Sequence, residues 1–126
     1  MYRNLLLAGT GGFIGSVMRY LVQILIEKNI SGTFPYGTMT ANILGSFIIG
    51  AVFALSEKGN LIGPEWRIFL AVGVCGGFTT FSAFSYNNFM MIKENSIIPF
   101  LLNTGGNLFL GILAVFLGVV FIRTIF

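Results

Sequence analysis

Four long apolar stretches limit how this 126-residue chain can fold more than any other feature of its sequence. They cover about residues 5–26, 37–55, 68–92 and 97–122. Each stretch is long enough to cross the roughly 30 Å hydrocarbon core of a bilayer, since a helix rises about 1.5 Å per residue. All three prolines lie at or near the polar connections between the stretches, where a missing backbone donor does little harm. The pattern predicts an all-α integral membrane protein, with residues 1–126 forming a single four-helix domain.

Composition agrees with a membrane protein and excludes several classes of chemistry. The chain is 56% hydrophobic and 9% charged, whereas a soluble domain has about 25% charged residues. A single cysteine, Cys75, excludes an intrachain disulfide, and the absence of histidine excludes a Ser-His-Asp triad within the chain. We therefore do not expect an enzyme. The net charge of +3 is interpreted as loop charge near anionic lipid, with no nucleic acid among the expected partners.

The charges outside the spans give only a weak orientation signal. Four spans place both termini and the second connection on one side of the membrane, with four basic residues against two on the other side. The four are Arg3, Lys58, Arg67 and Arg123, and the two are Lys28 and Lys93. So small a bias allows insertion both ways round, and hence an antiparallel homodimer built from one sequence. The alternative is a fixed orientation with cytoplasmic termini.

The third stretch contains the least helix-like sequence of the four. Gly76 and Gly77 precede two β-branched threonines, Thr79 and Thr80, and each glycine costs about 1 kcal/mol in a helix interior relative to alanine. A broken helix at membrane depth is tolerated where it lines a cavity, and its freed carbonyls can bind a cation. We predict a break here; the alternative is a continuous helix with its hydroxyls bonded to the preceding turn.

Aromatic and amide side chains near this segment favour an anion as the ligand. Phe81 and Phe84 share a helix face, and the edges of their rings are positive, although such rings are more often core or lipid-facing. Asn42 and Asn107 offer amide donors, or alternatively join helices. Arg19 is the ionisable residue well inside a span, where it either faces a vestibule or extends to the headgroups. No Asp or Glu lies within any span.

Other small and polar residues lie in the same spans. Gly11 and Gly15 form a G-x-x-x-G pair, which lets backbones approach closely. The second span carries additional hydroxyl groups, and the fourth carries a second asparagine four residues before Asn107. These residues are Thr38, Thr40, Ser46 and Asn103.

These motifs together resemble the bacterial CrcB/Fluc family of fluoride channels over essentially the whole chain. The most specific match is the run from Gly73 to Ser85, which contains GGFTTFSAFS. Weaker matches are the glycines and Arg19 of the first span, the segment from Gly37 to Gly45, and Asn107. The resemblance implies a passive, fluoride-selective channel that reduces fluoride toxicity, built as an antiparallel, dual-topology homodimer in the bacterial inner membrane.

The resemblance also implies roles for individual residues. A fluoride pathway is expected along six of them: Phe81, Phe84, Asn42, Ser82, Thr38 and Asn107. Arg19 is expected near the vestibule, where it attracts anions. The backbone carbonyls of Gly76 and Thr79 are expected to hold a structural Na⁺ at the dimer centre that is not transported.

Two other functions remain open at this point. A small multidrug-resistance-type exporter also has four short helices, but proton coupling needs an intramembrane carboxylate, and all four glutamates lie outside the spans. A non-transporting membrane assembly subunit would use its polar residues only to join helices.

Overall fold

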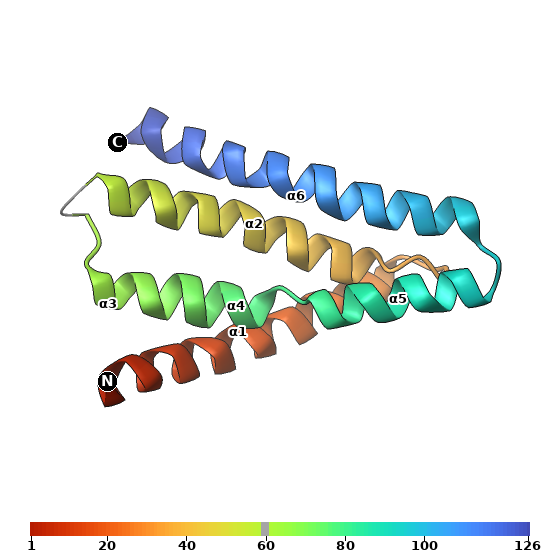
Figure 1. Ribbon diagram of the computed structural model, residues 1–126, viewed down its shortest axis with the longest axis horizontal. Helices are drawn as coiled ribbons and strands as arrows, with labels where there is room; N and C mark the ends of the chain where they lie inside the picture. The colour runs from red at the N-terminus through yellow and green to blue at the C-terminus, as the bar shows by residue number, and fades with distance from the viewer. Residues whose placement is uncertain (59–60) are drawn as a thin grey trace.

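The chain folds into four antiparallel helical spans joined by short connections (Figure 1). This computed structural model describes residues 1–58 and 61–126. Three spans are single helices and the third is a series of four segments. The elements are α1 (Tyr2–Asn29), α2 (Tyr36–Glu57), α3 (Pro64–Arg67), η1 (Ile68–Cys75), α4 (Gly76–Phe78), α5 (Phe81–Lys93) and α6 (Ile97–Ile125). All four spans are long and apolar enough to cross a membrane, which confirms the all-α membrane fold.

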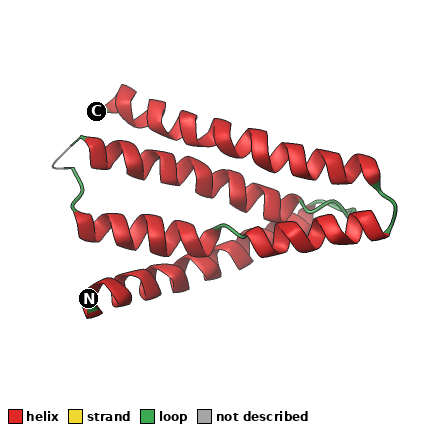
Figure 2. Cartoon of the chain, in the orientation of Figure 1, coloured by secondary structure: helices red, strands yellow, loops and turns green. Residues whose placement is uncertain are grey.

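The third span is broken near its middle, as predicted. Thr79 (φ −90°, ψ 154°) and Thr80 (φ −147°, ψ 119°) are both extended, and they form the short connection between α4 and α5 in Figure 2. Gly76 is still helical, with φ −61° and ψ −37°. The break therefore falls on the two β-branched residues, whose side chains favour extended backbone, and the glycine pair precedes it. Before the break, η1 is a wider π-helix, a form often found at functional sites.

Glycines bring α1 against the third span. A Cβ on Gly11 would lie 2.8 Å from the Cα of Gly73, and one on Gly77 would lie 2.5 Å from the carbonyl oxygen of Gly12. Gly15 faces the Val74 carbonyl so closely that a Cβ there would overlap it. The predicted close approach at the G-x-x-x-G pair is confirmed, because these backbones touch at positions where any side chain would separate them.

Glycines also bring α2 and α6 into close contact. A Cβ on Gly50 would overlap the Val115 carbonyl, and one on Gly118 would overlap the Phe47 carbonyl. Gly105, by contrast, faces open space. Close helix contacts therefore occur at Gly50 and Gly118, whereas Gly105 of the fourth span makes none.

The side chains are arranged as expected for a protein whose solvent is lipid. Large apolar residues such as Phe13 and Phe109 are more than two-thirds exposed, so they are available to the acyl chains. Asn103 is 1% exposed and is the largest fully buried side chain in the described part of the molecule. The interior of this fold therefore contains a fully buried amide, which must find hydrogen-bond partners.

Both termini lie at the same end of the molecule as the end of α2 and the start of α3 (Figure 1). Two ion pairs join elements there: Arg3 pairs with Glu65, and Arg123 Nη2 lies 2.9 Å from Glu57 Oε1. All four side chains are well exposed, so these pairs add little stability. Their geometry agrees with the grouping of the basic residues inferred from the number of spans.

Candidate functional site

Both ends of the broken helix are capped by threonine side chains. Before the break, the Thr79 hydroxyl and the Thr79 N–H both donate to the Cys75 carbonyl, at 2.9 and 3.0 Å. After the break, the Thr80 hydroxyl accepts a 3.2 Å hydrogen bond from the N–H of Ala83, as an N-cap residue does. The interruption is therefore a stabilised structure with its orphan backbone groups partly satisfied.

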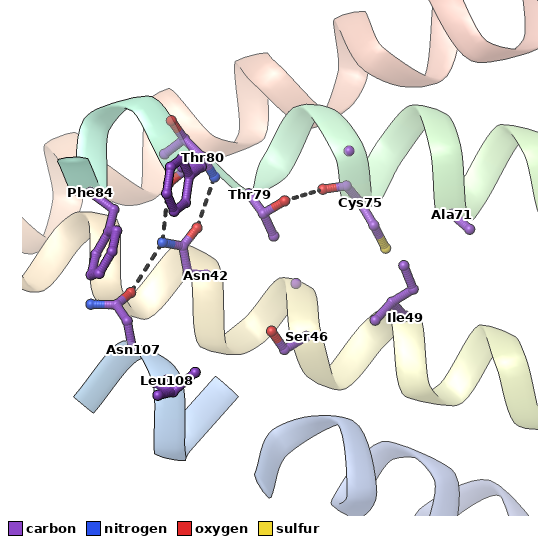
Figure 3. A pocket seen from close by; sticks show the side chains of 13 residues that line it. Asn42, Ser46, Ile49, Ala71, Cys75, Thr79, Thr80, Phe84, Asn107 and Leu108 are labelled. Carbon is purple, nitrogen blue, oxygen red and sulfur yellow. Dashed lines mark hydrogen bonds between the residues drawn. The ribbon is translucent and has the colours of Figure 1, made fainter. Parts of the chain in front are cut away.

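Asn42 on α2 binds the backbone of the break. Its Oδ1 accepts from the Thr80 N–H at 2.8 Å, and its Nδ2 donates to the Thr80 carbonyl oxygen at 3.3 Å. Figure 3 shows the amide beside the peptide group of Thr80. A side-chain amide thereby supplies the two hydrogen bonds that a neighbouring strand would offer to an extended residue. The polar side chain predicted at Asn42 thus holds the break in place.

A chain of asparagine amides continues from Asn42 across the molecule. Asn42 Nδ2 donates to Asn107 Oδ1 at 3.1 Å, and Asn107 Nδ2 donates to Asn103 Oδ1 at 2.9 Å. Asn103 Nδ2 then donates to Asn88 Oδ1 at 2.8 Å. A backbone N–H can only donate, so the N–H of Thr80 sets the direction of every amide that follows. The chain links α2, α6 and α5, and its successive bonds polarise one another.

Arg19 on α1 contacts the other side of the break. Its Nε donates a 3.1 Å hydrogen bond to the carbonyl oxygen of Gly77, near the end of the helical run that stops at Phe78. The residue is half-buried. A cation is favourable at this end because the carbonyls of the last turn give it a partial negative charge. The bond uses one of the five guanidinium N–H groups.

A pocket of about 420 Å³ lies beside the break, between α2, the two halves of the third span and α6 (Figure 3). The residues that line it carry no formal charge. The centroids of the Phe81 and Phe84 rings are 5.8 Å apart, with an interplanar angle of 44°. The walls include six residues predicted for the site: Asn42, Gly76, Thr79, Phe81, Phe84 and Asn107.

Three of the predicted residues lie outside the walls of this pocket. Thr38 is 7% exposed, and its hydroxyl accepts from Gln23 Nε2 at 3.2 Å. Ser82 is exposed, and its Oγ lies 3.2 Å from the Thr80 hydroxyl. Arg19 is on the α1 side of the break. The structure thus groups six of the predicted residues and places these three around them.

The carbonyls of Gly76 and Thr79 are suited to a cation. The Thr80 N–H, which would close a helical turn on Gly76, donates to Asn42 instead. The Ala83 N–H, which would close a turn on Thr79, donates to the Thr80 hydroxyl. Both carbonyl oxygens are therefore released from the helix beside the pocket, and oxygen ligands of this kind suit a hard cation such as Na⁺.

Several contributing residues were not assigned to the site from sequence. Asn103 was recognisable as the helix-face neighbour of Asn107, and Ser46 as a hydroxyl one turn beyond Asn42. Asn88 and Gln23 gave no signal, because their partners lie on other helices.

The fold and the site define a multi-pass membrane protein whose third helix is interrupted at an uncharged, polar and aromatic pocket. The chain belongs to the CrcB family: residues 6–119 match the family described as CrcB-like protein, Camphor Resistance (CrcB). This confirms the resemblance drawn from the motifs.

Curated relatives from bacteria are similar over most of the chain, and each is named "Fluoride-specific ion channel FluC". The Leptospira interrogans protein is 50% identical over 79% of this chain and 78% of its own. The Flavobacterium psychrophilum protein is 43% identical over 87% and 89%, respectively. The Chlorobium chlorochromatii protein is 42% identical over 95% and 92%.

Proposed function

We propose that this protein is a fluoride-selective channel that lets the ion leave the cell passively, down its electrochemical gradient. The observation that carries the proposal is the pocket at the break, which combines amide and hydroxyl groups with two phenyl rings and is lined by uncharged residues. The relatives named as fluoride-specific ion channels support the choice of ion. A channel is not an enzyme, and the proposal assigns no catalytic residue.

The pocket offers several weak contacts, as conduction requires. Fluoride is small and strongly hydrated, so a selective path must replace its water with closely fitting donors. The 3.3 Å bond from Asn42 Nδ2 to the Thr80 carbonyl is the longest of the Asn42 bonds, so we propose that fluoride takes this donor in exchange. The ring edges of Phe81 and Phe84 add a diffuse positive potential. Asn107 orients the Asn42 amide by accepting a hydrogen bond from its Nδ2.

The remaining predicted residues are proposed to act before and after the pocket. Arg19 has guanidinium N–H groups beyond the one donated to Gly77, and it would raise the local concentration of anions. The Thr38 hydroxyl accepts from Gln23, which leaves its own proton to donate. Ser82 is exposed and would contact the ion where it leaves the aromatic pair.

A second copy of the chain is proposed to complete the site. Phe81 is 78% exposed although it lines the pocket, so the aromatic wall is open in a single chain. An antiparallel homodimer would cover it and bring the two breaks together. The carbonyls of Gly76 and Thr79 in both chains would then hold a structural Na⁺, which neutralises their partial charges.

The test is fluoride efflux from liposomes that contain the purified protein, read with a fluoride electrode. Chloride efflux is the control for selectivity, and parallel preparations are made with and without Na⁺. We expect fast fluoride efflux, negligible chloride efflux, and loss of both the dimer and the flux without Na⁺. Absence of fluoride flux from folded protein would contradict the proposal and favour the assembly subunit, or the exporter if drug resistance is conferred.

Substitution of the rings tests the mechanism. Phe81→Ile or Phe84→Ile keeps an apolar side chain and removes the positive ring edge, so each variant is expected to lower fluoride efflux. Efflux at the wild-type rate in both variants would exclude the proposed role of the rings. Leu108→Ile, at an apolar position of the same wall, is the control for packing and should leave the rate near wild type.

A further inference from the structure

Ser46 places a hydroxyl on the wall of the pocket beyond the residues assigned above. It lies on α2 one helical turn after Asn42 and is half-buried (Figure 3). On the facing helix α6, Gly111 has no side chain, and a Cβ built there would have Ser46 Oγ as its nearest neighbour, 3.6 Å away. The Ser46 hydroxyl therefore faces space that the glycine leaves open.

The amide donors of the pocket and the Thr79 hydroxyl are already used within the protein. Asn42 Nδ2 donates to Thr80 and to Asn107, and Asn107 Nδ2 donates twice to Asn103. The Thr79 hydroxyl donates to the Cys75 carbonyl. An anion that enters the pocket must therefore displace one of these bonds or find another donor.

Ser46 is that other donor, and the contrast with a serine on the same helix supports this. Serine hydroxyls in helices commonly donate to the carbonyl four residues earlier. Ser56 does so, to the Val52 carbonyl at 2.9 Å. Within the described part of the chain, the Ser46 hydroxyl has no such hydrogen bond, although it lines the pocket.

We propose that the Ser46 hydroxyl donates a hydrogen bond to the small anion that passes through the pocket. This inference rests on the proposed fluoride channel and adds a contact one turn, about 5.4 Å, along α2 from Asn42. The ion would move from the exchangeable donor of Asn42 to the unused donor of Ser46 without returning to bulk water. Ser46 would thus help to determine the rate and the selectivity for fluoride.

The experiment compares serines on one helix. Ser46→Ala is expected to lower fluoride efflux about tenfold, because hydrogen bonds to charged groups are among the strongest that a hydroxyl makes. Ser56→Ala, whose hydroxyl is bonded within its own helix, is the matched control and should conduct at the wild-type rate. Ser46→Thr keeps the hydroxyl and should conduct faster than Ser46→Ala. Size-exclusion elution of each variant checks folding, and chloride efflux is measured throughout.

A double variant tests whether fluoride efflux requires the hydroxyl to be on α2 or only requires a hydroxyl at this place. Ser46→Ala with Gly111→Ser moves the hydroxyl from α2 to α6, into space where a Cβ would make an ordinary contact. We expect this variant to recover fluoride efflux relative to Ser46→Ala alone. Wild-type efflux in Ser46→Ala, or an equal loss in Ser56→Ala, would overturn the role of Ser46. Absence of fluoride efflux from the wild-type protein would instead overturn the channel function itself.

Discussion

Removal of the Asn42 amide should destabilise the extended segment at Thr80 more than any other single change at the pocket. Asn42→Ala deletes the bonds to the Thr80 N–H, the Thr80 carbonyl and Asn107. At about 0.6 kcal/mol for each interhelical hydrogen bond in a membrane, the three bonds predict a loss of about 2 kcal/mol in the free energy of unfolding. The Thr80 N–H also loses its acceptor, which adds to this loss because a half-buried donor is left without a partner.

The assay is reversible unfolding in mixed detergent micelles, with amide hydrogen exchange measured at Thr80. Asn29→Ala is the control, because that side chain is exposed and bonds only to its own helix, at Leu25. It should change the stability by less than about 0.5 kcal/mol. Asn42→Asp should destabilise as much as Asn42→Ala or more, because it places an oxygen against two acceptors. The reasoning would be refuted if Asn42→Ala matched Asn29→Ala in stability and left exchange at Thr80 unchanged.

Two further predictions concern α1. Gly15→Ala forces a Cβ against the Val74 carbonyl and should destabilise the protein by about 1–3 kcal/mol. Gly9→Ala faces open space and should stabilise the protein by about 0.5–1 kcal/mol. Equal unfolding free energies for the two variants would contradict this packing. Arg19→Gln removes a charge and weakens the contact with Gly77, so fluoride efflux should fall more at low than at high ionic strength. Arg19→Lys keeps the charge and should therefore keep the salt-dependent contribution to fluoride efflux. A loss in Arg19→Gln that does not vary with salt would assign Arg19 to structure alone.

The four spans and the presence of a break could be predicted from sequence because both depend on local properties. A span needs only about 20 apolar residues in a row, and the break needs residues that are poor in helices. The exact position of the break was not predictable in this way. It falls at Thr79 and Thr80, while Gly76 and Gly77 remain helical, because Gly77 is used for close packing against α1.

The partners of the polar side chains depend on the rotation of each helix about its axis, which the apolar periodicity of a membrane helix does not define. Asn103 and Asn107 share a face because they are four residues apart, and this could be read from the sequence. That Asn103 would meet Asn88, rather than its neighbour Asn87, requires the orientation of α5 relative to α6. The contact between Arg19 and Gly77 likewise joins residues 58 positions apart.

The position of the break is therefore determined by tertiary contacts more than by local propensity. A glycine pair alone would allow the helix to bend at Gly76 and Gly77, yet a Cβ at Gly77 would meet the Gly12 carbonyl at 2.5 Å, so α1 holds this turn in a helical form. The chain leaves the helix after Phe78, at Thr79 and Thr80, and Asn42 supplies the hydrogen bonds that an extended Thr80 needs. It follows that α1 and α2 together specify where the carbonyls are released, and that changes in either helix should alter the site.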